Sequence, residues 1–199
     1  MRLDDVNPYI EDGLTHNNAS KYLLYNDPLI GTFDSVVQKD TVEKFWKNSR
    51  ASWRTAEGKS VFLLDGNARN LCLVLEKKAD LGREIRLAYS QEDKETLQEI
   101  ANIKIPVLLQ RLQDFYQSFR TQWNLENKSF GFEVQTVRIG GLLQRLKDVQ
   151  EILNAYLREE IPGIAELNEP QKAFHYFEQN EIRSLNYNLW TDIVSPSKI

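Results

Sequence analysis

Two arginines whose spacing places them on one helical face are the first candidates for chemistry in this sequence. Arg138 and Arg145 are seven residues apart, flank Gly140-Gly141 and have Glu133 nearby. Guanidinium groups bind carboxylates and phosphates through two parallel hydrogen bonds. The pattern favours a partly buried ion-pair network over a ligand site. The glycine pair predicts tight helix packing rather than a phosphate cradle.

A second candidate is a mixed aromatic and polar cluster within residues 16–31. Aromatic rings stack on the apolar face of a pyranose, and polar groups bind its hydroxyls, so the composition suits a sugar site. An apolar loop buried at a domain or subunit interface explains the same residues, and we favour that interpretation. The candidate residues are His16, Lys21, Tyr22, Tyr25 and Asp27.

The sequence gives little support for a metal site, a cofactor site or a catalytic nucleophile. The two histidines, His16 and His175, form no pair at ligand spacing, and there is no Gly-x-Ser-x-Gly or Gly-rich phosphate loop. The only cysteine, Cys72, lies in an apolar run and is predicted to be an inert core residue. Lys78 falls near an apolar helical phase, which favours a lysine that extends its amine to solvent. We predict no catalytic residue, bound metal or cofactor in this chain.

The elements that position these residues are four predicted helices, at about 36–56, 61–89, 92–125 and 133–160. Apolar residues recur every three or four positions in each, which is typical of an antiparallel all-α bundle. Gly82 predicts a close contact or a kink, and Pro106 a bend or a split. The clearest stripes contain Leu71, Val74, Leu75, Leu81, Ile85; Leu108, Leu112, Phe115, Phe119, Trp123; and Leu142, Leu146, Val149, Leu153, Tyr156.

Both ends are predicted to be irregular extensions of the bundle. Residues 1–34 combine turn signals with large apolar side chains, so we expect them to pack against these helices or against a neighbouring domain. Residues 170–183 suit a short helix and 184–199 a strand or extended tail. The predicted organisation is a lead-in (1–34), a bundle (35–165) and a helix with a C-terminal tail (166–199).

Composition narrows the class of protein. Hydrophobic residues make up 41% and charged residues 27% of the 199 residues, as in a globular protein. The net charge of -4 argues against nucleic acid and against anionic lipid surfaces. The sequence contains neither a signal-peptide pattern nor a membrane-spanning apolar run. With a single cysteine, these features favour the cytoplasm.

Three stretches resemble the C-terminal region of bacterial family 20 glycoside hydrolases, the exo-β-N-acetylhexosaminidases of the streptococcal type. They are NASKYLLYNDPLIG (18–31), LEKKADLGREIRLAY (75–89) and FGFEVQTVRIGGLLQRL (130–146). In that family an Asp-Glu pair in a His-x-Gly-Gly-Asp-Glu motif performs substrate-assisted catalysis. This sequence contains neither an Asp-Glu dipeptide nor a His-x-Gly-Gly, so no catalytic residue transfers.

The resemblance implies a non-catalytic domain attached to a catalytic barrel of the same polypeptide. A (β/α)₈ barrel needs about 250 residues, more than this chain contains. The implied parent removes terminal β-linked N-acetylglucosamine or N-acetylgalactosamine and forms a homodimer. Two alternatives remain open, namely a stand-alone helical protein-interaction module and a small sugar-binding module that uses residues 16–31.

Overall fold

The computed structural model describes residues 23–34, 37, 41–50 and 59–170. Within those ranges all regular structure is helical and there is no strand, which confirms the predicted all-α class. The elements are α2 (Thr41–Arg50), α3 (Lys59–Lys78), α4 (Leu81–Ser90), α5 (Lys94–Glu99), a π-helix (Ile100–Lys104), α6 (Ile105–Glu126), α7 (Phe132–Leu157) and α8 (Ala165–Asn168). None of these helices is both long enough and apolar enough to cross a membrane.

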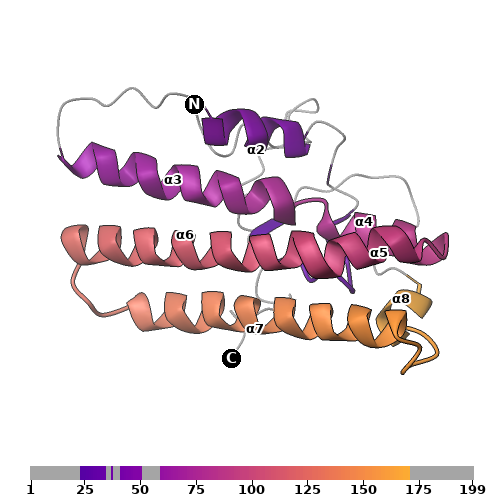
Figure 1. The fold of residues 1–199 in the computed structure, drawn as a ribbon. Coiled ribbons are helices and arrows are strands. Elements are labelled where there is room, and N and C mark those ends of the chain that lie inside the picture. The colour runs from indigo at the N-terminus through magenta and orange to yellow at the C-terminus, as the bar shows by residue number, and fades with distance from the viewer. Residues whose placement is uncertain (1–22, 35–36, 38–40, 51–58, 171–199) are drawn as a thin grey trace, which may run out of the picture.

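The three long helices form an antiparallel stack (Figure 1). In that view α6 lies between α3 and α7, and α2 covers the outer side of α3. The predicted stripes face the interior, because spacings of three and four place their members on one side of each helix. The side chains at the centre are inaccessible to solvent: Leu75, Leu81, Ile85, Leu108, Leu112, Leu146, Val149 and Leu153 are each 0% exposed.

The segment predicted as one helix over 61–89 is broken into α3 and α4 at Ala79-Asp80. Asp80 accepts a hydrogen bond from the side chain of Arg83 at 2.8 Å, and its carbonyl accepts the Glu84 N–H at 3.0 Å, so a new helix starts there. Gly82 in the first turn of α4 permits a close contact, as expected. Its neighbour is the segment 23–34 rather than another helix.

Pro106 explains the π-helix that precedes α6. The Ile105 N–H reaches the Ile100 carbonyl, five residues back, which is the π pattern. The next bond of this pattern would join residue 106 to Ala101, but proline has no N–H. Gln150 of α7 donates its amide to the Ala101 carbonyl instead, at 2.8 Å. The predicted irregularity at Pro106 is therefore confirmed, and a side chain of α7 satisfies the carbonyl that it leaves unpaired.

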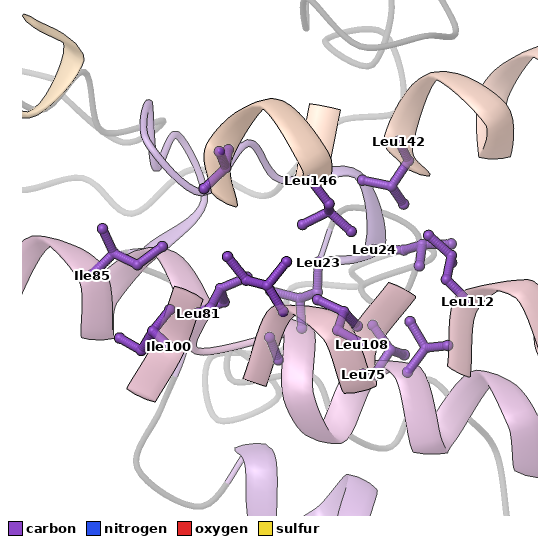
Figure 2. Close-up of a cluster of buried hydrophobic side chains, with 14 of the residues drawn as sticks. Leu23, Leu24, Leu75, Leu81, Ile85, Ile100, Leu108, Leu112, Leu142 and Leu146 are labelled. Carbon is purple, nitrogen blue, oxygen red and sulfur yellow. The ribbon is translucent and has the colours of Figure 1, made fainter. Parts of the chain in front are cut away.

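Segment 23–34, which we call the lead-in segment, is part of the core. Leu23, Leu29 and Phe33 are each 1% exposed or less. Figure 2 shows Leu23 and Leu24 among leucines that come from α3, α6 and α7. Of the two alternatives for the irregular N-terminal region, packing against these helices therefore holds for residues 23–34. Residues 1–22 and 171–199, including most of the predicted helix over 170–183 and the tail over 184–199, lie outside the described residues.

Substitution by alanine should change stability in opposite directions at Gly82 and at Gly140. A Cβ atom on Gly82 would lie 2.8 Å from Oδ1 of Asp34, which is buried, and 3.0 Å from the Pro28 carbonyl oxygen. A Cβ atom on Gly140 would meet nothing within 4 Å, so of the pair Gly140-Gly141, for which we expected tight packing, Gly140 is not tightly packed.

Gly82→Ala should therefore lower the free energy of unfolding by about 1–2 kcal/mol through overpacking. Gly140→Ala should raise it by up to about 1 kcal/mol, because alanine is the better helix former. Urea unfolding monitored by circular dichroism measures both changes. If Gly82→Ala leaves stability unchanged or raises it, α4 does not pack tightly against the lead-in segment.

Candidate functional site

Lys78, the last residue of α3, lies at the centre of a buried polar cluster. Its side chain is only 2% exposed, and its Nζ donates a hydrogen bond to the Asn26 carbonyl of the lead-in segment. The expectation that this lysine reaches solvent is therefore wrong. The apolar phase of α3 is covered at this point by the lead-in segment, which supplies the acceptor that a buried ammonium group requires.

Asn26 and Asp34 complete the environment of Lys78. The Asn26 side-chain amide donates to Asp34 Oδ1 at 2.7 Å, and its Oδ1 accepts the Phe33 N–H at 3.0 Å. Burial lowers the pKa of Lys78 to about 8, although the charges of Asp27 and Asp34 act in the opposite direction. Burial raises the pKa of Asp34, which the Asn26 hydrogen bond and the charge of Lys78 only partly offset. Burial therefore disfavours the charged forms of both Lys78 and Asp34, and their neighbours offset this effect only in part.

Arg145 of α7 holds the other acidic residue of the lead-in segment. Its Nε lies 2.6 Å from Asp27 Oδ2 and its Nη2 lies 3.2 Å from Oδ1, a bidentate arrangement. Burial alone would raise the pKa of Asp27, but the Arg145 hydrogen bond and charge lower it, together with the backbone N–H groups of Ile30 and Leu29. The same guanidinium lies 3.5 Å from Glu166 of α8.

Arg86 of α4 makes a similar bridge through backbone carbonyls. It donates to the Leu29 carbonyl at 2.7 Å and to the Leu167 carbonyl at 3.4 Å. Tyr89 Oη accepts the Ile164 N–H at 3.1 Å and bonds Asn168 at 2.9 Å. Arg86 and Arg145 therefore both connect the lead-in segment to the region of α8. We call this set the polar junction: Asn26, Asp27, Asp34, Lys78, Arg86, Arg145 and Glu166.

The structure brings together only some of the residues that the sequence singled out. Asp27 and Arg145 meet, whereas the Glu133 carboxylate accepts the Gly131 N–H at 2.7 Å at the start of α7. Arg138 has a buried Nε without a hydrogen-bond partner in the described structure. Tyr25 is 8% exposed, and burial raises its pKa to about 12. His16, Lys21 and Tyr22 lie outside the described residues.

A second charged cluster was not predicted. Glu76 is buried, and its Oε2 lies 3.2 Å from Arg50 of α2 and 3.5 Å from Arg111 of α6. It joins three helices, as the polar junction joins the lead-in segment, α3, α4, α7 and α8. The only sequence signal was a carboxylate directly after the apolar run that contains Cys72. That cysteine is buried as predicted, and burial raises its pKa to about 11.

The geometry suits a structural role. The buried charged groups bond a backbone carbonyl, the Asn26 amide or an oppositely charged side chain, and the amine of Lys78 is covered by the lead-in segment. Within the described ranges no group of three or more His, Cys, Asp or Glu side chains is arranged to hold a metal ion. The arrangement fixes where the chain enters and leaves the bundle.

Comparison with known families decides the assignment. The model of the Glycoside Hydrolase 20C C-terminal domain matches residues 1–186. The chain belongs to this family. The match confirms the resemblance inferred from three short stretches, and it extends over the lead-in segment and the whole helical body. No curated protein matches the sequence. In this glycoside hydrolase 20C C-terminal domain, every residue of the polar junction lies within the range that the family model matches.

Proposed function

We propose that this domain is a non-catalytic scaffold at the C-terminal end of a β-N-acetylhexosaminidase. The parent enzyme removes terminal β-linked N-acetylglucosamine or N-acetylgalactosamine, and its catalytic barrel, in the same polypeptide, is the partner of this domain. The parent is a homodimer, and the domain contributes to the assembly. The observation that carries this proposal is the match of residues 1–186 to a family defined as a C-terminal domain.

The chemistry of the described carboxylates supports the scaffold role. Canonical glycosidases place two carboxyl groups on either side of a scissile bond, with space for a sugar between them. Here the acidic groups with the most buried positions are committed to other partners: Asp27 to Arg145, Asp34 to Asn26 and Glu76 to Arg50. Such groups stabilise the fold and are poorly placed to transfer protons to a substrate.

We further propose that the polypeptide is organised as lead-in (1–34), bundle (35–165) and C-terminal extension (166–199). The contacts of the polar junction support this division. Because Arg86 and Arg145 bind residues 27–29 on one side and residues 166–167 on the other, the two segments that flank the bundle keep a fixed position on it. Because these segments are held rigidly, a domain joined to the lead-in would keep a fixed orientation relative to the bundle.

One observation favours the alternative of a protein-interaction module. Leu125, Phe130 and Val134, at or beside the turn between α6 and α7, are 65%, 88% and 44% exposed. A group of exposed apolar side chains is typical of a contact surface, whereas a single one is ordinary. The sugar-binding alternative receives less support, because Tyr25 is buried and Asp27 is paired with Arg145. The natural reading frame separates the first two hypotheses: a preceding catalytic barrel with an Asp-Glu pair supports the scaffold, and its absence supports the module.

The scaffold hypothesis is tested on the full-length natural polypeptide. The purified protein should hydrolyse an aryl N-acetyl-β-glucosaminide or galactosaminide, and light scattering should give the mass of a dimer. A full-length protein that is inactive on both substrates would contradict the assignment of the parent. A monomeric mass would contradict only the proposed dimer.

A further inference from the structure

Arg86 of α4 spends its hydrogen bonds, within the described ranges, on the two segments that flank the bundle. Its Nη2 donates to the Leu29 carbonyl of the lead-in segment at 2.7 Å, and its Nη1 donates to the Leu167 carbonyl of α8 at 3.4 Å. Its Nε is buried and has no hydrogen-bond partner among the described residues. The guanidinium therefore spans two segments, although a buried donor without an acceptor costs free energy.

Arg145 of α7 spans the same two segments through side chains. Its Nε lies 2.6 Å from Asp27 Oδ2, and its Nη2 lies 3.2 Å from Asp27 Oδ1 and 3.5 Å from Glu166 Oε1. In both arginines the contact with the lead-in segment is the shorter one. Because a guanidinium is a rigid planar fork, the contacts with the lead-in segment also fix the nitrogens that face α8.

Residues 164–168 depend on the bundle for their conformation. The helix α8 has four residues, far fewer than an isolated helix needs to be stable in water. Ile164 and Leu167 are 1% and 8% exposed, and the Tyr89 hydroxyl bonds the Ile164 N–H and the Asn168 side chain. The attachment of this stretch therefore combines two apolar side chains, one tyrosine hydroxyl and the two arginines that the lead-in segment positions.

We propose that the lead-in segment and residues 164–168 form one cooperative unit, whose two parts detach from the bundle together. If the lead-in segment left alone, Arg86 and Arg145 would keep only their contacts at 3.4 and 3.5 Å, and hydrogen bonds of that length are weak. Partly buried guanidinium groups would then lack acceptors, whereas joint detachment opens them to water.

The consequence is a coupling between the two ends of the domain, which goes beyond the scaffold role. A partner that binds one segment in its detached state weakens the attachment of the other segment by the same factor, because coupling free energies are reciprocal. The lead-in segment and α8 therefore respond to each other although they lie on opposite sides of the bundle in the sequence.

Hydrogen exchange of the full-length protein, followed by mass spectrometry, tests the proposal with Tyr89→Phe. The substitution removes the hydroxyl that bonds Ile164 and Asn168, and neither of these bonds involves the lead-in segment. Exchange over residues 164–168 should accelerate about tenfold, because a backbone donor loses its acceptor. Exchange over residues 27–33 should accelerate by the same factor, because the two segments open in one event.

Tyr116→Phe is the matched control. It removes a tyrosine hydroxyl that bonds Thr136 at 3.0 Å and so joins α6 to α7 outside the polar junction. Both peptides should keep their wild-type exchange rates. If Tyr116→Phe accelerates them as much as Tyr89→Phe does, the two segments open only when the whole bundle unfolds, and the proposal is wrong.

Asp27→Asn perturbs the unit from its other side, because the amide cannot form the ion pair with Arg145. Exchange over residues 164–168 and over residues 27–33 should again accelerate by a common factor. A wild-type rate over 27–33 in Tyr89→Phe, or over 164–168 in Asp27→Asn, would show that the two segments detach independently and would overturn the proposal.

Discussion

Replacing Arg145 by methionine should lower the free energy of unfolding by about 3 kcal/mol, the lower end of the range for breaking a buried ion pair. The loss arises because Asp27 keeps its charge while it loses both hydrogen bonds from the guanidinium. The side chains of Arg145 and Asp27 are 29% and 16% exposed, so water replaces the missing partner only in part. Methionine preserves most of the aliphatic contact, which isolates the effect of the charge.

A matched control is available on the surface. Arg158 forms a bidentate pair with Glu160 of nearly the same geometry, but the two side chains are 59% and 54% exposed. Arg158→Met should therefore change stability by less than about 0.5 kcal/mol. Denaturant unfolding compares the two variants directly. Equal and small losses would mean that the polar junction does not hold the lead-in segment.

The pH dependence of this contribution follows from Asp27. Its pKa in the folded protein lies below the ordinary value, so the unfolded state binds the proton more readily. The stabilisation is fully present above the ordinary pKa of the carboxyl group and is lost as the pH falls through the lowered one. The difference in stability between the wild type and Arg145→Met should therefore shrink in acid.

Lys78 should produce a dependence of the same sign at alkaline pH, because its pKa is also lowered in the folded protein. Its pKa falls from 10.5 to about 8 on folding, so between these values the unfolded state holds more protons than the folded state. Stability attributable to Lys78 must then rise with pH. Relative to Lys78→Met, the wild type should gain about 2 kcal/mol between pH 7.5 and pH 9.5.

The comparison with Lys78→Met is necessary because other groups titrate nearby. Burial raises the pKa of Cys72 to about 11 and that of Tyr25 to about 12, and both lower stability as the pH rises through their ordinary values. These two contributions are the same in both proteins and cancel in the difference. Urea midpoints at three pH values measure that difference. A difference that stays constant with pH would show that Lys78 is not buried as a charge.

The helical core was predictable because its information is local. The stripes on α6 and α7 follow from spacings of three and four that any straight helix turns into one face. The break at Ala79-Asp80 was not predictable from that pattern, because apolar residues continue at helical spacing on both sides of it. Gly82 and Pro106 marked the irregular positions correctly. The residues that contact these positions come from distant segments: Asp34 lies against Gly82, and Gln150 bonds the Ala101 carbonyl that Pro106 leaves unpaired.

The polar junction was largely hidden for the same reason. Asp27 and Arg145 are 118 residues apart, and Lys78 and Asn26 are 52 apart. Each residue was noticeable by its type, but the pairing depends on the lead-in segment entering the core, which no local pattern indicates. The interpretation of Lys78 as solvent-reaching was wrong because the side chain was judged against its own helix alone. Glu133, placed near the arginines by sequence, instead binds the backbone at the start of α7.

The central claim is that this chain supports catalysis without performing it, and a single assay tests the claim most directly. The purified chain of residues 1–199 is incubated with an aryl N-acetyl-β-glucosaminide at a concentration at which full-length enzyme gives a strong signal. The account predicts no release of the aryl group above the blank. Saturable turnover that survives purification and follows the protein would contradict it.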